Sequence, residues 1–594
     1  MNLRSAPRRA VVRAAVAVAL CVSACSLARA EIKIEISGID GDLRRNVQAL
    51  LSVERYKDRD RLEEDAVQRL FGRVDTETRN ALRPFGYYEP RVDAHLKQEG
   101  SKDWRVDIKV EPGQAVHVNT VSVVVEGEGQ SDPSFQTLAE HPTIQPGQQL
   151  DHGAYETLKG SLQRVAASNG YMDARMLRNE LRVNLATHEA DIDLAIETGR
   201  RYHFGATTIQ QSAVREKNIR RYLRYNDGEP YDAVKLLRTQ FALDDSTYFS
   251  NVEVTAGDPD RETLAIPIRI QATTGRNTYS IGAGYGTDTD VRGTLTFTDP
   301  LVNSLGHRLR VQLQASDITQ EIIARYDIPF GDPAREKLSA YLVRENSVQS
   351  DSVSTSVLSL TPSITQVLGR WQRVLSFAMA HNVTRDAVNG RQVENLAVPG
   401  ITYASVPEGY LGEDLFSRTF YVQLLASHPE LGASAPFLRL DLQFERVFDL
   451  SPKWHLLLRN ELGATAVNSV DNLSGTYRFF AGGDRSVRGF GYDTLSPTEI
   501  SSTGSVERIG GRDLFTGTVE FERDLPRLWG VAAFTDYGNA FNYFGDPLAL
   551  SVGVGVRWRL PVVTFGLDIA QALRAPGYDE LPGPRFHLNI SPKL

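Results

Sequence analysis

The second half of the chain alternates apolar and polar residues with a period of two. From residue 276 onward, runs such as Leu438, Leu440 and Leu442 are interleaved with charged residues such as Arg439. This alternation predicts strands with one apolar and one polar face. The apolar face would contact a second sheet in a soluble sandwich, and lipid in a membrane barrel.

The number of these runs favours a barrel over a secreted β-rich domain. Residues 276–594 hold about 14 to 17 alternating runs. Bacterial membrane barrels have even strand numbers, and roughly 16 strands would leave about 20 residues for each strand and its connection. The sequence therefore predicts a membrane β-barrel of roughly 16 antiparallel strands.

The first half repeats one arrangement three times. Each copy reads strand, helix, helix, strand, strand, and a glycine closes each copy. The copies cover about 31–113, 114–199 and 200–275. Their second helices end in similar turns, which are Phe85-Gly86-Tyr87-Tyr88, Asn169-Gly170-Tyr171-Met172 and Ser246-Thr247-Tyr248-Phe249. The apolar positions that indicate these helices are Tyr155, Leu158, Leu162 and Val165 in the second copy, and Val234, Leu237 and Phe241 in the third.

Residues 1–30 have the pattern of a secretory signal peptide. Arginines come first, an apolar stretch follows, and Ala28-Arg29-Ala30 fits a cleavage site. The apolar stretch is too short for a spanning helix. The alternative is lipoprotein processing, with Cys25 lipidated. The only two cysteines, Cys21 and Cys25, lie in this segment, which excludes a disulfide scaffold for the rest of the chain.

Composition and motif spacing exclude several kinds of function. The net charge of −8 argues against a nucleic-acid binder, which would normally carry a basic surplus. The eleven histidines are scattered without metal-ligand spacing. The glycine-rich run from Gly282 to Gly286 is not followed by a helix, so it does not predict a phosphate loop. We expect no enzyme, no cofactor and no metal.

One long segment, about 468–511, interrupts the alternation. It contains Val487-Arg488-Gly489-Phe490, and long loops inside a barrel are usually functional. Gly517-Thr518-Val519-Glu520 and Phe534-Thr535-Asp536-Tyr537-Gly538 follow in strand-like sequence, and residues 585–594 look like a terminal strand. In this order the motifs resemble those of the TamA-type branch of the BamA-like superfamily, and the repeated units resemble POTRA domains.

The resemblance implies a role in the outer membrane of a Gram-negative bacterium, with the POTRA domains in the periplasm. A protein of this kind would insert or translocate autotransporters and other β-barrel proteins. Its partners would be a TamB-like periplasmic protein, unfolded outer-membrane protein clients and outer-membrane lipid. A role in phospholipid transport is a further implication. The alternative from another class is a two-partner secretion-type transporter or a passive pore.

In this superfamily the loop folds back into the lumen, which suggests a partner for its arginine. Phe534, Asp536 and Gly538 share one strand face. If that face lines the lumen, Asp536 can form a bidentate pair with Arg488, and Glu520 on the neighbouring strand can join it. We therefore expect Asp536 and Glu520 to anchor the loop.

The first and last barrel strands form the seam where we expect the mechanism to lie. The first strand, about 277–286, carries three glycines, which weaken a strand interior. The closing strand, about 585–590, soon reaches Pro592, which cannot donate to a ladder. An opened seam would template client strands, whereas the alternative is that the glycines only relieve crowding in a closed lumen. The seam residues are Gly282, Gly284, Gly286, Phe586, Leu588 and Ile590.

Overall fold

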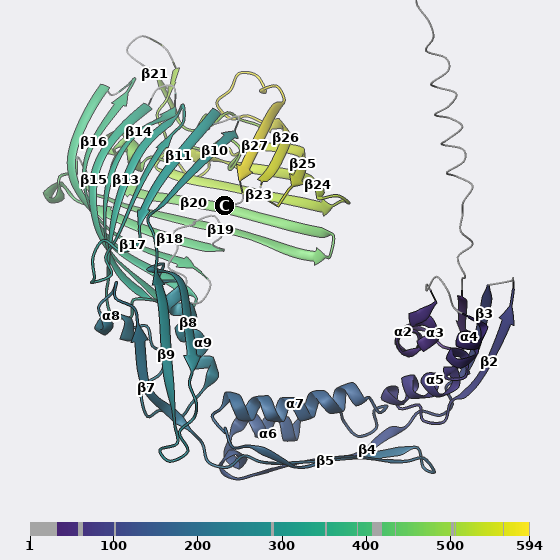
Figure 1. The fold of residues 1–594 in the computed structure, drawn as a ribbon. Helices are drawn as coiled ribbons and strands as arrows, with labels where there is room; N and C mark the ends of the chain where they lie inside the picture. The colour runs from purple at the N-terminus through teal and green to yellow at the C-terminus, as the bar shows by residue number, and fades with distance from the viewer. Residues whose placement is uncertain are drawn as a thin grey trace, which may run out of the picture. The chain divides into compact units, whose positions relative to one another are not determined.

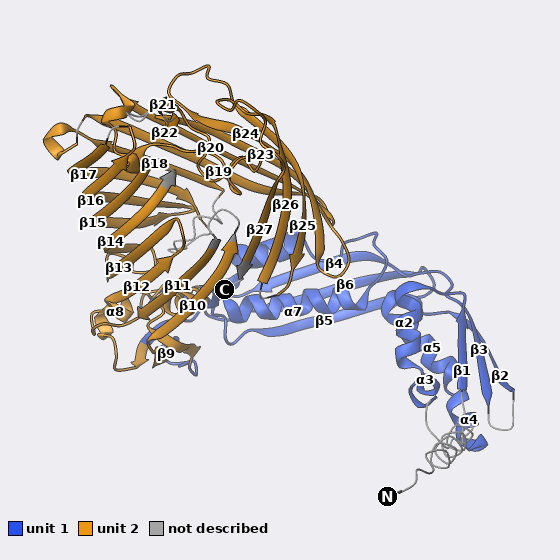
Figure 2. Ribbon diagram, turned by 90° about the horizontal axis from the view of Figure 1, so that it is seen from above, with its two compact units in different colours: residues 1–206, 227–234, 257–267 blue, residues 207–226, 235–256, 268–594 orange. Residues whose placement is uncertain are grey.

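The chain forms two compact units in the computed structural model. The structure describes residues 32–57, 63–99, 103–286, 290–350, 353–388, 390–406, 419–433, 435–500, 504, 506–561 and 563–592. The expected signal peptide and Cys25 lie outside the described residues. Unit 1 comprises residues 1–206, 227–234 and 257–267, and unit 2 comprises residues 207–226, 235–256 and 268–594 (Figure 2).

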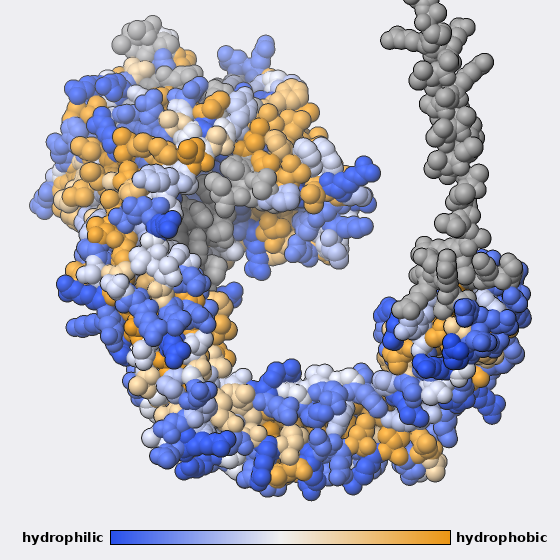
Figure 3. Space-filling view, in the orientation of Figure 1, coloured by the Kyte–Doolittle hydropathy of each residue, from blue (hydrophilic) through white to orange (hydrophobic). Residues whose placement is uncertain are grey.

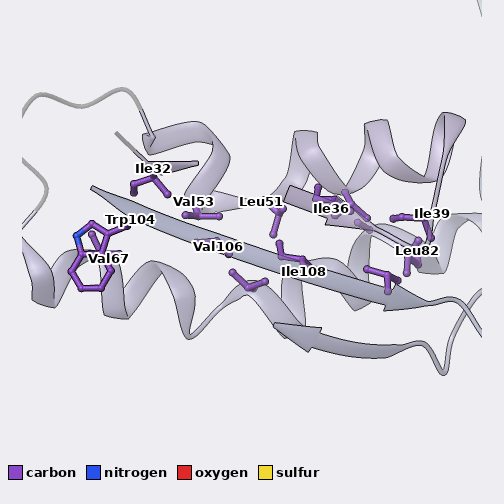
Figure 4. Packing of buried hydrophobic residues seen from close by; sticks show 14 residues of the cluster. Ile32, Ile36, Ile39, Leu51, Val53, Val67, Leu82, Trp104, Val106 and Ile108 are labelled. Carbon is purple, nitrogen blue, oxygen red and sulfur yellow. The ribbon is translucent and has the colours of Figure 1, made fainter. Parts of the chain in front are cut away.

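The first module packs short helices on a three-stranded sheet of order β1-β3-β2. Leu51, Val53 and Leu82 of the helical layer pack against Val106 and Ile108 of the central strand (Figure 4). The module has four helices among its described residues, whereas the sequence predicted two. The extended backbone of Leu51 separates the first two of these helices. The elements are β1 (Ile32–Ser37), α2 (Gly41–Leu50), α3 (Ser52–Tyr56), α4 (Glu64–Phe71), α5 (Val74–Leu82), β2 (Arg91–Gln98) and β3 (Trp104–Glu111).

The second module has the predicted order of elements. Its sheet has the strand order β4-β6-β5. Helix α7 buries Tyr155, Leu158 and Leu162, three of the four positions that indicated it in the sequence, and Val165 is half-buried. The elements are β4 (His117–Glu126), α6 (Pro133–Glu140), α7 (His152–Ser168), β5 (Arg175–Asn184) and β6 (Glu189–Glu197).

The third module has the predicted elements, but its second helix packs through another face. Helix α9 buries Leu236, Ala242 and Leu243. The apolar positions that indicated the helix are half exposed instead, with Val234 and Leu237 at 50% and Phe241 at 56%. Two apolar stripes compete on this short helix, and packing selects the other one. The elements are β7 (His203–Gln210), α8 (Glu216–Arg220), α9 (Ala233–Asp244), β8 (Phe249–Ala256) and β9 (Ala265–Thr274), with sheet order β7-β9-β8.

Sixteen antiparallel strands close into a barrel, which confirms the predicted fold class (Figure 1). Each strand except the last pairs with the next along the chain, and β27 returns to β10. The strands are β10 (Thr278–Gly286), β11 (Asp290–Asp299), β12 (Arg308–Ala315), β13 (Thr319–Pro329), β14 (Glu336–Ser350), β15 (Val353–Leu368), β16 (Trp371–Asp386), β17 (Gly390–Ser405), β18 (Phe420–Ser427), β19 (Phe437–Ser451), β20 (Trp454–Val467), β23 (Asp513–Asp524), β24 (Trp529–Phe541), β25 (Ala549–Arg559), β26 (Val563–Arg574) and β27 (Arg585–Pro592).

The two faces of the barrel wall differ in chemistry, as the alternation predicts. Leu342, Leu360 and Phe377 are among the large apolar side chains exposed on the outside, where apolar patches are visible (Figure 3). Charged residues such as Asp441 and Glu520 are buried inside. Apolar residues outside and charged residues inside are the reverse of the arrangement in a water-soluble protein, and they suit a barrel wall that faces lipid. None of the helices among the described residues is long and apolar enough to cross a membrane.

Within unit 2, residues 215–224 of the third module lie against two turns of the barrel. Arg224 Nη1 is 2.7 Å from Asp332 Oδ2, and Arg224 Nη2 is 3.1 Å from Asp332 Oδ1. Backbone carbonyls of the turns accept the other hydrogen bonds. These bonds run from Arg215 N to Ser304 O at 2.9 Å, from Asn218 Nδ2 to Leu305 O at 3.1 Å, and from Arg221 Nη2 to Gly331 O at 2.7 Å.

Candidate functional site: the lumenal segment and the barrel seam

The segment between β20 and β23, residues 468–512, carries an arginine that is buried against the barrel wall. Two nitrogens of Arg488 donate to Asp536 of β24, with Nη2 at 2.8 Å from Oδ1 and Nε at 2.9 Å from Oδ2. The backbone N–H of Arg488 donates to the same carboxylate at 3.1 Å. The Arg488 side chain is 4% exposed and that of Asp536 is 0% exposed. The structure thus brings these two predicted residues together in a bidentate, desolvated pair.

Two further carboxylates surround the same guanidinium. Arg488 Nη1 is 2.8 Å from Glu520 Oε2 of β23 and 3.3 Å from Asp568 Oδ2 of β26. Arg557 of β25 also contacts both acids, with Nη2 at 3.2 Å from Glu520 Oε1 and at 3.0 Å from Asp568 Oδ2. Two arginines therefore share three carboxylates, and the network joins the segment to four successive strands.

Asp568 and Arg557 are parts of this network that the sequence analysis did not single out. Asp568 lies on the polar face of an alternating run, so the sequence predicts which face of the barrel wall carries it. The sequence does not predict which polar residues of the neighbouring strands contact Asp568, because the register between strands decides this. Arg557 lies next to Asp568 through this register, in which Arg557 pairs with Gly566.

The residues beside Arg488 fit tightly into the wall. Val487 and Phe490 are buried, in a cluster that includes Ala549 and Ala572 of the barrel. At Gly489 an added Cβ would lie 2.6 Å from the Ser551 Cβ, so only glycine fits at this close approach. The four residues of the motif thus combine a charged contact, apolar packing and a steric requirement.

A second buried ion pair holds the segment at another part of the wall. Arg478 Nη1 is 2.8 Å from Asp386 Oδ2 of β16, and both side chains are 0% exposed. The remaining donors of Arg478 reach the carbonyls of Leu473 at 2.8 Å and Ile509 at 2.9 Å. Sequence reasoning missed this pair. The segment contains several arginines, and no local pattern relates Arg478 to an aspartate that lies 92 residues away in the chain.

The lumenal segment also contacts the last barrel strand. The Nε2 atom of His587 in β27 is 2.7 Å from the backbone carbonyl oxygen of Arg488. Asn589 Nδ2 donates to Asp484 Oδ2 at 3.4 Å. The segment is therefore bonded directly to one of the two strands that form the seam.

The seam itself has the shortest ladder of the three that involve its strands. Among the described residues, β10 and β27 share two register pairs, Tyr285 with Ile590 and Gly286 with Asn589. By contrast, β10 shares nine pairs with β11, and β27 shares eight with β26. The backbone comes close here, since an added Cβ at Gly284 would lie 3.3 Å from the Ile590 carbonyl oxygen.

The other predicted seam residues lie beside this short ladder. Gly282 precedes the paired stretch of β10, and Leu588 precedes the paired stretch of β27. Phe586 is largely exposed. In the described part of the chain, no cluster of histidine, cysteine, aspartate or glutamate could hold a metal ion.

Comparison with protein families gives two matches. Residues 409–593 match the Omp85 superfamily domain, and residues 33–112 match TamA POTRA domain 1. The outer membrane protein assembly factor BamA of Neisseria meningitidis serogroup B is 27% identical over 583 residues, which is 85% of this chain and 71% of that protein. BamA of Nitratidesulfovibrio vulgaris is 22% identical over 426 residues, which is 67% of this chain and 52% of that protein.

A solved structure has the same fold. The crystal structure of Haemophilus ducreyi BamA lacking POTRA domains 1–3 matches with a TM-score of 0.65 and 15% identity, over 80% of this chain and 99% of that one. Residues 409–593, which include the lumenal arginine, thus match the Omp85 superfamily domain, and the chain has the fold of the BamA structure. The chain is similar to BamA proteins over most of its length, and its first module matches a POTRA domain of the TamA type.

Proposed function

We propose that this chain is an outer-membrane insertase or translocase subunit that assembles autotransporters and other β-barrel proteins at its lateral seam. The observation that carries the proposal is the two-pair ladder between β10 and β27. In the Gram-negative outer membrane such a barrel would keep its POTRA domains in the periplasm. The names of the relatives, outer membrane protein assembly factors, support the same class of function.

The seam offers strand edges to a client. Among the described residues, the stretch of β10 from Thr278 to Gly284 has no register partner in β27. The stretch of β27 from Arg585 to Leu588 likewise has no register partner in β10. Unpaired N–H and C=O groups on such edges can pair with an incoming strand. A client strand would pair with the free edge of β10 or β27. Opening the seam would break only the two register pairs between these strands.

The three POTRA-like modules suggest the partner. Their number and the TamA-type match at residues 33–112 support a TamB-like periplasmic protein as the partner of the modules. Unfolded outer-membrane protein clients would pass from the periplasm to the seam, and outer-membrane lipid would surround the apolar wall.

A reversible crosslink tests the proposal. No cysteine follows Cys25, so Tyr285→Cys with Ile590→Cys introduces one pair across the seam. These residues are direct register partners, whose Cβ atoms lie within reach of a disulfide. The full chain is reconstituted in liposomes with a urea-unfolded barrel client, and folded client is measured by heat-modifiable migration. We expect oxidation to reduce assembly to the level of empty liposomes, and reduction to restore it.

The matched control is a disulfide in the neighbouring ladder. Leu567→Cys with Leu588→Cys joins β26 to β27 at a register pair that need not separate. This variant should assemble clients in both redox states. Full activity with the seam quantitatively crosslinked would refute the seam mechanism. A wild-type protein that conducts ions strongly and assembles no client would instead indicate a passive pore.

A further inference from the structure

A cavity of about 370 Å³ lies within unit 2, between the third module and the inner face of the barrel. The module contributes Tyr222 and the stretch from Asp245 to Tyr248. The barrel contributes residues at one end of β12, β13 and β14. The alternation of β12 puts Arg308 and Arg310 on the face opposite to that of Leu313, which is exposed.

The lining carries more positive than negative charge. Its cations are Arg308, Arg310, Arg325 and Lys337, and its carboxylates are Asp245 and Asp327. Asp327 is already engaged, since Oδ1 accepts from Arg325 Nε at 2.7 Å and from the Ser339 hydroxyl at 2.6 Å. Although the register places Asp327 opposite Arg308, its carboxylate bonds to Arg325 and Ser339, and it forms no ion pair with Arg308.

The two arginines of β12 are poorly compensated. Arg308 Nε is buried without a hydrogen-bond partner, and no carboxylate of the described residues lies within ion-pair distance of Arg308. Arg310 makes one long contact, with Nη2 at 3.4 Å from Gln312 Oε1. The register also places Arg310 directly opposite Arg325. Like charges opposite one another destabilise a sheet unless an anion lies between them.

We propose that this cavity binds a phosphate group through Arg308 and Arg310. A guanidinium presents paired N–H donors that match phosphate oxygens, and two arginines two positions apart on one strand face can reach the same tetrahedral anion. A phosphate carries up to two negative charges, which offsets the surplus of two cations in the lining. A single carboxylate would offset only half of it.

The tyrosines on the opposite wall are suited to the same ligand. Tyr248 donates its hydroxyl to the Gly306 carbonyl at 2.8 Å, and this contact holds the module side of the cavity against the barrel. Burial raises the pKa of Tyr222 and of Tyr248, so both phenols stay neutral and add no negative charge to the cavity. The wall facing the arginines therefore does not repel an anion.

The full chain, purified in a neutral maltoside detergent without phosphate, is titrated with inorganic phosphate by calorimetry. The double variant Arg308→Gln and Arg310→Gln removes both charges and keeps side-chain length. We expect saturable binding by the wild type and binding that is about tenfold weaker or more in the variant. Heat-modifiable migration checks that the variant barrel is folded. If it is not, the single variant Arg308→Lys keeps the charge, loses the fork, and should bind several times more weakly.

A control and a competition complete the test. Arg335→Gln removes a positive charge from the neighbouring β13–β14 turn, outside the cavity lining, and should bind phosphate like the wild type. Free phosphate and a lipid headgroup share the proposed chemistry. Displacement of phosphate by short-chain phosphatidylglycerol would assign the site to a headgroup, and its failure would assign it to the free ion. Equal binding by the wild type and the double variant, or binding only of an acidic peptide, would overturn the proposal.

Discussion

At the scale of single residues, Arg488 joins the lumenal segment to three carboxylates of the barrel wall. Its guanidinium contacts Asp536, Glu520 and Asp568, and its carbon Cζ lies 3.2 Å from the centroid of the Phe534 ring. Removing one partner of a buried pair leaves the other charge desolvated and unpaired, which is more costly than losing a surface ion pair. The stability of the segment should therefore depend strongly on this residue.

A double-mutant cycle measures this dependence. Arg488→Ala should lower the free energy of unfolding by about 3–5 kcal/mol, and Asp536→Ala should have a similar effect, because each leaves an uncompensated buried charge. The double variant should be little worse than the more damaging single one, since the second change removes the charge that the first left unpaired. Urea unfolding in detergent, followed by tryptophan fluorescence, provides the free energies.

The matched control is Arg574→Ala, an exposed arginine at the end of β26, which should change stability by less than about 0.5 kcal/mol. Losses that add fully in the cycle would show that Arg488 and Asp536 act independently.

The sequence predicted part of this network for a definite physical reason. Period-two alternation put Phe534, Asp536 and Gly538 on one face, and the resemblance to the superfamily implied that Asp536 and Glu520 on this side anchor the loop. Alternation carries no information on register, and therefore Asp568 and Arg557 were not singled out. The path of the segment through the lumen is set by its contacts with distant strands. For that reason the pair between Arg478 and Asp386 had no counterpart in the sequence reasoning.

At the scale of elements, the third module is bonded to the barrel within unit 2. Residues 215–224 bond to the β11–β12 and β13–β14 turns, and Tyr248 bonds to Gly306. Within unit 2, Gly275 follows β9 and donates its N–H to the Tyr248 carbonyl at 2.7 Å, just before β10 begins. The apolar spacing of Val234, Leu237 and Phe241 predicted the second helix of this module. It did not reveal that helix α9 would bury the other stripe, because both stripes are apolar.

Deletion of a module tests the importance of this attachment. Loss of residues 200–275 should abolish client assembly, because it removes the residues that bond to the barrel turns within unit 2. Loss of residues 31–113 should reduce assembly less. Both are measured in the liposome assay, with barrel folding checked by heat-modifiable migration. A folded barrel that remains fully active without residues 200–275 would contradict this expectation.

At the scale of the whole barrel, the lumenal segment is fixed to two separate parts of the wall. Arg478 holds it to β16, and Arg488 holds it to β23, β24 and β26. Five strands lie between β16 and β24 in the barrel order. A segment held on both sides obstructs the interior, in contrast to the water-filled channel of a porin.

Ion conductance measures this obstruction. In planar bilayers the wild type should conduct weakly for a barrel of sixteen strands. The double variant Arg478→Ala and Arg488→Ala should conduct severalfold more strongly and with more noise, because the segment is released at both attachments. The exposed-site variant Arg574→Ala should conduct like the wild type. A wild type with the steady, large conductance of an open porin would contradict this prediction.

The hydrogen bond between His587 and the Arg488 carbonyl makes the two margins of the seam mechanically unequal. The margin formed by β27 is stiffened from the lumen, because the same segment is also bonded to β23, β24 and β26. The margin formed by β10 has β11 as its full-length neighbour and contains glycines at alternate positions. Bending should therefore concentrate in β10, so that a client strand meets one compliant margin and one rigid margin that holds its register.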